Sequence, residues 1–272
     1  MKNISRATKS TLALFLSWRP LWLLRQLRQL RLSQLLRLPL RLPLRLLPVV
    51  LPLLLLTTEV TAQANLDPTR WNDAMAAFAE KDKLNPPPQG AILLTGSSSI
   101  ARWNDEAAAA LAPLTVIPRG FGGSVMGDVL HHLDTVALQY RPRAILIYEG
   151  DNDTARGVPV ATVLDQFRQI VDKIHETLPD TRIYVMAVKP SVSRVEVWPL
   201  AQQVNAGLSA IAERDPQVYF VDSATPFLQA NGKVMTDIFV DDNLHLNTMG
   251  NLIWGSIIRA SLMPIEVRYE HE

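Results

Sequence analysis

Short apolar runs alternate with longer amphipathic segments along residues 65–272, and this alternation determines the predicted elements. Runs rich in branched and aromatic side chains predict five strands, at residues 91–95, 115–117, 144–148, 182–188 and 218–221. Segments with helical periodicity predict five helices, at residues 99–112, 125–139, 159–178, 199–213 and 248–261. A leading helix near residues 70–83 precedes the three prolines at 86–88 and is expected to pack outside the core.

Strands that alternate with helices form βαβ units, so the pattern predicts an α/β fold with a parallel sheet covered on both faces. The strands are almost wholly apolar, which agrees with burial from both sides. Residues 65–272 are long enough for one domain with a sizeable core. Because ligands of such sheets bind beyond the carboxyl ends of the strands, the chemistry is expected directly after each strand.

Residues 1–64 form a segment of different composition. Residues 25–47 repeat an Arg-Leu-Pro-Leu unit, and prolines at 39, 43, 48 and 52 oppose a regular helix. An apolar run at 46–56, too short to span a bilayer, is followed by small residues. This pattern predicts a secretory signal with cleavage after Ala64, and hence export to the periplasm or the medium. The alternative is an uncleaved, arginine-rich tail that lies on a membrane surface.

Charge and cysteine content exclude several classes of function. The chain has no cysteine, which excludes disulfides, thiolate metal sites and a cysteine nucleophile. The formal net charge of +1 hides an asymmetry, since residues 1–64 carry ten Lys or Arg and a single acid. The remaining residues have a net charge of −8. Nucleic acid is therefore not an expected partner, because binding phosphates requires clustered basic residues.

Four polar segments follow the predicted strands, and together they contain the parts of an acyl-transfer site. They read "GSSSI" (96–100), "PRGFGGS" (118–124), "EGDND" (149–153) and "DDNLHLN" (241–247). A serine nucleophile needs a base, and His245 suits this role with Asp242 three residues earlier to orient its ring. The oxyanion needs fixed donors, which the backbone N–H groups of Ser98 and Gly123 and the amide of Asn152 could supply.

These four segments resemble, in order, the conserved blocks of the SGNH (GDSL-type) hydrolases. The resemblance covers residues 90–262 and implies a three-layer α/β/α sandwich with a five-stranded parallel sheet. It places Ser98 at the nucleophile position, Asp242 and His245 in the triad, and Gly123 and Asn152 in the oxyanion hole. It implies hydrolysis of lipid, acyl or acetylated-sugar esters without a metal or an organic cofactor. The α/β-hydrolase alternative needs a G-x-S-x-G run, which the chain lacks.

Two positions depart from the family pattern. Ser97 stands where the usual Gly-Asp-Ser has its aspartate, and "GSSSI" followed by Trp103 resembles a variant subgroup of bacterial envelope proteins. Pro118 occupies a position where the second block often has an asparagine. The first departure leaves the proposed triad complete, whereas the second removes a side chain that would brace the glycine loop.

Several alternatives remain open at this stage. The domain could transfer acetyl groups to a glycan, or bind a glycan or lipid without catalysis. The acidic residues near the site could hold a metal ion, a reading we consider weaker than a supporting role for Asp153 in the Asn152 loop. Glu149 and Arg156 could form an ion pair or contact the substrate, and Trp198 could line a pocket or pack a loop. The set of acids in question is Asp151, Asp153 and Asp241.

Overall fold

A computed structural model describes residues 66–270, and the predictions for residues 1–64 lie outside the described residues. All five predicted strands are present and pair in parallel in the order β2-β1-β3-β4-β5. The α/β prediction is therefore confirmed. The strands are β1 (Ile92–Gly96), β2 (Val116–Gly120), β3 (Ala144–Tyr148), β4 (Arg182–Met186) and β5 (Val218–Val221).

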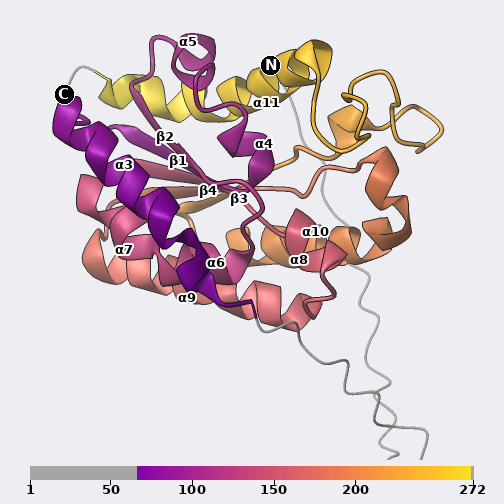
Figure 1. Cartoon of the computed structure of the whole chain (residues 1–272), viewed down its shortest axis with the longest axis horizontal. Coiled ribbons are helices and arrows are strands. Elements are labelled where there is room, and N and C mark those ends of the chain that lie inside the picture. Colours follow the sequence, from indigo (N-terminus) through magenta and orange to yellow (C-terminus); the bar gives the residue numbers. More distant parts are fainter. Residues whose placement is uncertain (1–65, 271–272) are drawn as a thin grey trace, which may run out of the picture. The chain divides into compact units, whose positions relative to one another are not determined.

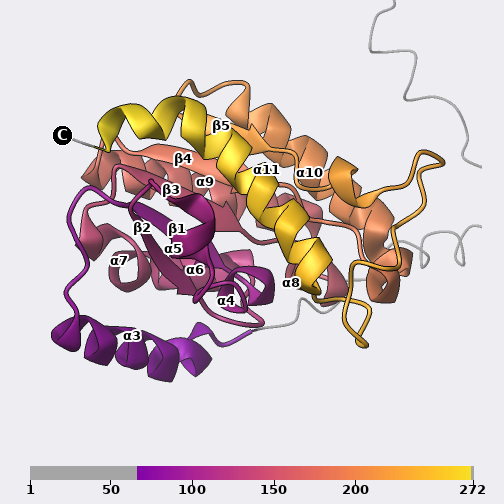
Figure 2. The same ribbon diagram turned by 90° about the horizontal axis from the view of Figure 1, so that it is seen from above.

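Helices cover both faces of the sheet and make three layers (Figures 1 and 2). One face packs against α6 (Met126–His131), α9 (Val160–Thr177) and α10 (Trp198–Ala212). The other face packs against α4 (Ser98–Ala101), α5 (Ala107–Leu111) and α11 (Thr248–Glu266). Successive strand residues alternate between the two layers: Leu93 joins the first core, while Ile92 and Leu94 join the second. This arrangement confirms the predicted sandwich.

Strand β2 continues beyond its predicted end at residue 117 and includes Pro118. It lies at the edge of the sheet, with Pro118 paired in register with Leu94 of β1. An edge strand tolerates proline because one side of its backbone needs no partner within the sheet. The strand therefore carries the chain to Gly120, directly before the glycine loop.

The single helix predicted over residues 99–112 is wrong, since a turn separates α4 from α5. The side chain of Asn104 in this turn donates to the carbonyl oxygen of Gly120 at 3.0 Å and accepts from its N–H at 3.1 Å. Trp103 beside it is buried at 1% exposure. A side chain that bonds backbone groups in this way competes with helix formation, and here it secures the edge of β2.

The other helices differ from prediction mainly in their limits. The segment 125–139 divides into α6, α7 (Leu133–Val136) and a 3₁₀ turn (Leu138–Tyr140). The leading helix is α3 (Asn72–Leu84), which packs Met75 and Phe78 against the first core from outside. Helix α8 (Asp151–Ala155) was not predicted, because five mostly polar residues show no periodicity. No helix within residues 66–270 is long and apolar enough to cross a membrane.

The topology brings the polar segments to one place. Strand β1 lies between β2 and β3, so the chain leaves β1 and β3 toward opposite sides of the sheet. In doubly wound sheets, this reversal opens a crevice at the carboxyl ends of the two strands. The segments at 96–100 and 149–153 follow these two strands directly, and the candidate site is built there.

Candidate active site

Ser98 begins α4 immediately beyond the end of β1. The preceding Gly96 has a φ of +125°, and a Cβ atom there would lie 2.1 Å from the carbonyl oxygen of Tyr148 in β3. Only glycine permits this close approach of the two strands. The N–H of Ser97 then donates to the same Tyr148 oxygen at 3.0 Å. The chain turns sharply at this point and leaves the side chain of Ser98 partly exposed.

A tight turn at 240–245 presents His245. The Oδ1 atom of Asp242 accepts from the N–H groups of Leu244 and His245, both at 2.9 Å. Asn243 adopts a left-handed φ of +56°, which asparagine tolerates better than most residues. The N–H of Val240 closes the turn by donating to the carbonyl oxygen of His245 at 2.9 Å. Asp242 thus forms an Asx turn with Leu244, and this turn places His245 three residues after the carboxylate.

Two hydrogen bonds join Ser98, His245 and Asp242. The His245 Nε2 atom lies 2.8 Å from Ser98 Oγ, and its Nδ1 atom lies 2.6 Å from Asp242 Oδ2. Because the Asp242 carboxylate only accepts, Nδ1 carries the proton and neutral His245 presents the lone pair of Nε2 to the serine. The structure therefore brings together three predicted residues that are up to 147 positions apart.

Asp242 keeps its charge in this arrangement. Partial burial alone would raise the pKa of Asp242, but it accepts hydrogen bonds from the ring of His245 and from two backbone N–H groups. These bonds and the nearby imidazole outweigh burial and hold the pKa of Asp242 well below its ordinary value. The side chain is 41% exposed, whereas that of His245 is 14% exposed. The carboxylate is therefore ionised whenever the imidazole is neutral.

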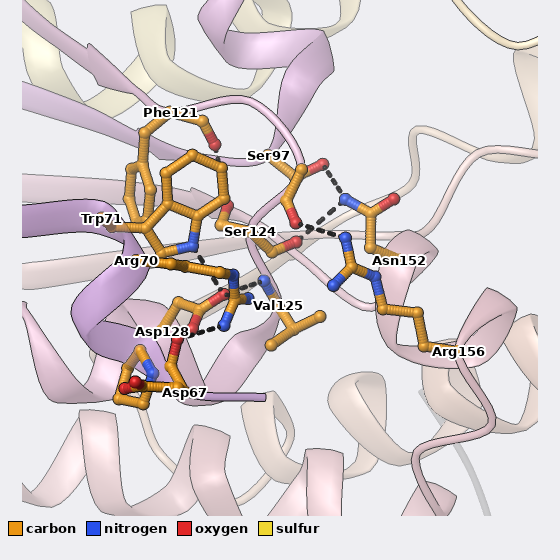
Figure 3. A network of polar contacts seen from close by, with 12 residues as sticks. Asp67, Arg70, Trp71, Ser97, Phe121, Ser124, Val125, Asp128, Asn152 and Arg156 are labelled. Atoms are coloured by element: carbon orange, nitrogen blue, oxygen red, sulfur yellow. Dashed lines mark hydrogen bonds and ion pairs between the residues drawn. The ribbon is translucent and has the colours of Figure 1, made fainter. Parts of the chain in front are cut away.

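The Asn152 amide points from α8 toward Ser97, the residue before Ser98 (Figure 3). Its Nδ2 atom donates to the Ser124 carbonyl oxygen at 2.9 Å and to Ser97 Oγ at 3.2 Å. The second distance is at the long end of the range for such bonds. Ser97 stands where the family pattern has aspartate, and its hydroxyl oxygen accepts this second bond.

Gly123 lies between an aromatic and a cationic side chain. Its φ is +86°, and a Cβ atom there would lie 3.7 Å from the indole of Trp71 and 3.9 Å from the guanidinium of Arg156. Arg156 donates to the Gly123 carbonyl oxygen at 3.2 Å, and Trp71 packs edge-on against Phe121 at 5.5 Å between ring centroids. The glycine loop is therefore flanked by Trp71, which comes from a 3₁₀ turn (Pro68–Trp71) before α3.

Asp128 connects this turn to the glycine loop (Figure 3). Its carboxylate accepts from Arg70, from the indole N–H of Trp71 at 3.0 Å and from the backbone N–H of Val125 at 2.9 Å. The side chain is 1% exposed and forms an ion pair with Arg70. Residues before the first strand thus stabilise the loop that carries Gly123, a contribution that no sequence motif indicated.

Asp153 connects the glycine loop to the Asn152 loop. It accepts from the N–H of Met126 at 3.0 Å and from the N–H of Gly150 at 3.0 Å. Burial raises the pKa of Asp153 to about 6, although these bonds favour its ionised form. The expected supporting role of this residue agrees with these contacts.

Glu149 and Arg156 do not pair with each other. Glu149 is completely buried and accepts from the hydroxyl of Ser124, while its Oε2 atom has no partner within the described residues. Burial, with the neighbouring charge of Asp153, raises the pKa of Glu149 well above its ordinary value. Arg156 is exposed at the rim of the glycine loop. Of the two alternatives, the ion pair is therefore wrong.

The structure adds two cationic residues that sequence reasoning missed. Lys189 is buried just beyond β4 and donates to the carbonyl oxygen of Leu244 at 2.8 Å, inside the His245 turn. Burial lowers the pKa of Lys189 below its ordinary value. Arg194, in the 3₁₀ segment Val192–Val197, bonds the side chains of Asp151 and Asn152. Neither belongs to a motif with a recognisable spacing, so only their contacts identify them.

The remaining alternatives concern acids and Trp198. Asp151 pairs with Arg194, Asp153 binds backbone N–H groups, and Asp241 is exposed. Within residues 66–270, no three His, Asp or Glu side chains are grouped in a way that could hold a metal ion. Trp198 begins α10 and packs against the first core, which favours the packing alternative.

Solved structures with this fold include several hydrolases. A GDSL-like lipase from Bacteroides thetaiotaomicron is 16% identical, with a TM-score of 0.62, over 70% of this chain and 97% of its own. A lipase/acylhydrolase from Enterococcus faecalis is 18% identical, with a TM-score of 0.51, over 65% and 96%. An acetylxylan esterase from Geobacillus stearothermophilus is 15% identical, with a TM-score of 0.53, over 64% and 95%. At these identities the likeness concerns the fold alone.

The sequence itself gives a more specific match. No curated protein matches the chain significantly. The model of the GDSL-like Lipase/Acylhydrolase family, however, matches residues 87–253, which include all four polar segments and most of the sheet and its helices. The resemblance noted in the motifs is thereby confirmed, whereas the "GSSSI" subgroup stays a prediction. The chain belongs to the GDSL-like lipase/acylhydrolase family.

Proposed function

We propose that this protein is a serine esterase that hydrolyses carboxylic esters. The observation that carries the proposal is the pair of hydrogen bonds from Ser98 to His245 and from His245 to Asp242, at 2.8 and 2.6 Å. A serine hydroxyl becomes a competent nucleophile only when a base within hydrogen-bond reach can take its proton. The partly exposed Ser98 and the nearly buried imidazole meet this requirement at the open end of the sheet.

The proposed reaction has two steps. Ser98 Oγ forms a bond to the ester carbon as His245 Nε2 takes its proton, and the carbonyl electron pair moves onto the oxygen. His245 then protonates the leaving alcohol, whose C–O bond breaks and leaves an acyl-serine. Water repeats the sequence and releases the acid. Asp242 holds the ring in one tautomer and stabilises the imidazolium that forms twice in the cycle.

The oxyanion would be stabilised by three N–H donors. These are the backbone N–H groups of Ser98 and Gly123 and the side-chain amide of Asn152. Gly123 is partly exposed and has no side chain to lie between its backbone and a substrate. The oxyanion would replace Ser97 Oγ as acceptor for Asn152, since that bond is the longer of the two that the amide makes. This set uses no metal or organic cofactor.

Substrates of two kinds fit the proposal. One is a lipid or acyl ester and the other an acetylated sugar, the second kind being suggested by the acetylxylan esterase that shares the fold. Transfer of an acetyl group to a glycan hydroxyl is the alternative, and it differs only in the acceptor of the acyl group. Non-catalytic binding is disfavoured because the Ser98, His245 and Asp242 contacts are all in place.

The location of the protein follows from a separate proposal. We propose that residues 1–64 direct export, or else attach the protein to a membrane surface, as their composition suggests. Sequencing the amino terminus of the protein from an exported fraction should find Asn65. An intact terminus on protein from the soluble cell interior would contradict export.

A fluorophosphonate probe tests the esterase proposal most directly. Peptide mapping should find the adduct on Ser98, and Ser98→Ala should abolish both labelling and hydrolysis of p-nitrophenyl esters. Ser97→Ala is the matched control, because it removes a neighbouring hydroxyl and should keep substantial activity. An adduct on Ser97 or Ser99, or full activity in Ser98→Ala, would refute the assignment. A series of p-nitrophenyl esters of increasing chain length, followed by acetylated glycans, would identify the substrate.

A further inference from the structure

We infer that Arg194 is a positioning residue for the oxyanion hole. It fixes the orientation of the Asn152 amide, so that the N–H end and not the oxygen meets the substrate. The inference rests on the proposed function, because it assigns Arg194 a role through Asn152. Arg194 lies in the connection after β4, outside the four polar segments from which the site was predicted.

An asparagine amide has one accepting and one donating side, and the chemistry of its neighbours decides its orientation. The Arg194 guanidinium, a donor only, lies 2.8 Å from Asn152 Oδ1. The Ser124 carbonyl oxygen, an acceptor only, lies 2.9 Å from Nδ2. A rotated amide would set its N–H against the guanidinium and its oxygen against the carbonyl. Arg194 and Ser124 therefore select the same orientation, with the second N–H aimed at the serine loop.

Arg194 is itself held firmly. Its other terminal nitrogen donates to Asp151 Oδ1 at 2.7 Å, and the Asp151 side chain is nearly buried. Two bonds to adjacent residues, made by one planar group, use the fork geometry of guanidinium. Only 19% of the Arg194 side chain is exposed, so the cation is partly shielded from water. A cation bonded to the amide oxygen also draws electron density from the amide and strengthens its N–H groups as donors.

The same connection also contacts the histidine turn. The N–H of Ser193 donates to the carbonyl oxygen of Asn243 at 3.1 Å, between Asp242 and His245. The backbone of Ser193 therefore contacts the turn that carries the base, and the side chain of Arg194 contacts the amide of the oxyanion hole. This arrangement sets the position of the oxyanion donor relative to the base.

A double-mutant cycle in the full chain tests this role. With p-nitrophenyl acetate as substrate, Asn152→Ala should lower kcat by about 10²–10³-fold, as for loss of one oxyanion donor. Arg194→Gln should lower kcat by about 10–10²-fold and change KM less than about threefold, because only the orientation of that donor is lost. In the Asn152→Ala background, Arg194→Gln should cost less than about threefold. Arg168→Gln, at an exposed position of α9, is the matched control and should match the wild type.

A spectroscopic measurement separates orientation from general loss of structure. In ¹H–¹⁵N spectra, the Asn152 side-chain amide is identified by its absence in Asn152→Ala. Arg194→Gln should move this pair of signals toward free-amide positions while leaving most backbone signals in place. Arg194→Lys keeps the charge but lacks the planar, two-nitrogen fork that bonds Asp151 and Asn152 together, so its kcat should also fall, with a native spectrum.

The outcomes distinguish failure of this inference from failure of the esterase proposal. Wild-type kcat in Arg194→Gln or in Arg194→Lys, alongside an impaired Asn152→Ala, would overturn the role of Arg194 and leave the esterase proposal standing. An equal cost of Arg194→Gln in both backgrounds would likewise overturn it, because Arg194 would then act independently of Asn152. Full activity in both Ser98→Ala and Asn152→Ala would instead refute the esterase proposal.

Discussion

An acidic side chain is buried at each end of the sheet, but the partners of the two side chains differ. At the amino end, Glu266 of α11 is completely buried and accepts from Arg143, Arg182 and Tyr184 at distances of 2.6–3.2 Å. Both of its oxygens therefore have donors. At the carboxyl end, Glu149 is equally buried, yet its Oε2 atom has no partner within the described residues.

The two ends of the sheet therefore have different roles. Both carboxylate oxygens of Glu266 accept hydrogen bonds, so its role is structural. It connects α11 to the starts of β3 and β4. At the carboxyl end, hydrogen bonds orient side chains, namely the Asn152 amide and the His245 ring. Substitutions at the two ends should accordingly affect different measurable quantities: activity at one end and stability at the other.

The largest effect is expected at the carboxyl end, for His245→Ala. Without the base, Ser98 keeps its proton, so kcat/KM for p-nitrophenyl acetate should fall by about 10⁴-fold or more. The midpoint of urea unfolding should change little, since the ring is held by a surface turn. In the wild type, activity should disappear as the pH falls and an imidazole can no longer accept a proton. A pH-independent rate from pH 5 to 9 would contradict the role of His245.

The second effect should be a loss of stability without loss of catalysis. Glu266→Ala leaves two guanidinium groups and a buried hydroxyl without their shared acceptor, which should lower the free energy of unfolding by about 3–5 kcal/mol. Below the unfolding temperature, kcat should stay within about twofold of the wild type. Glu176→Ala, at an exposed position of α9, is the control and should leave stability unchanged. A large fall in kcat in the folded variant would contradict the separation of the two ends.

The sequence predicted the sheet well because each strand is a short apolar run between turn-forming residues. It failed where a distant contact decides local structure. Asn104, in the turn between α4 and α5, bonds the backbone of Gly120, and no pattern within 99–112 reveals that partner. The strand predicted at 115–117 continues through Pro118, and only the edge position of β2 explains why the proline is tolerated.

The site was predicted to the extent that its residues lie in the polar segments beyond the strand ends. Ser98, Asn152 and His245 lie in segments that the parallel topology brings to one edge. The residues that orient them lie in connections without recognisable spacing. Trp71 precedes the first strand, and Arg194 lies in the segment after β4. Their contribution depends on tertiary contacts, which single-sequence patterns do not contain.

The smallest effect should come from Glu149→Gln, which tests whether the buried acid at the carboxyl end is uncharged. Burial raises the pKa of Glu149 well above its ordinary value, so the carboxyl group is uncharged in the folded protein at mildly acidic pH. Glutamine is also uncharged, has nearly the same shape and can accept from Ser124. At pH 5 the substitution should therefore change the free energy of unfolding by less than about 1 kcal/mol.

The test is how the difference in unfolding free energy between Glu149→Gln and the wild type changes with pH. In the wild type, the folded chain keeps the proton of Glu149 at a pH where the unfolded chain has lost it, so this residue contributes its full stability only below its ordinary pKa. That contribution is lost as the pH rises toward the folded-state pKa, whereas glutamine has no proton to lose. Urea unfolding of both proteins at pH 5, 7 and 9 should show Glu149→Gln gaining stability relative to the wild type as the pH rises. All other titratable groups are common to the two proteins, so their contributions cancel in this difference. A constant difference in unfolding free energy across the three pH values would therefore mean that Glu149 is already ionised in the folded protein. Its unpartnered oxygen would then belong to a charged carboxylate, and the two ends of the sheet would hold their buried acids in the same state.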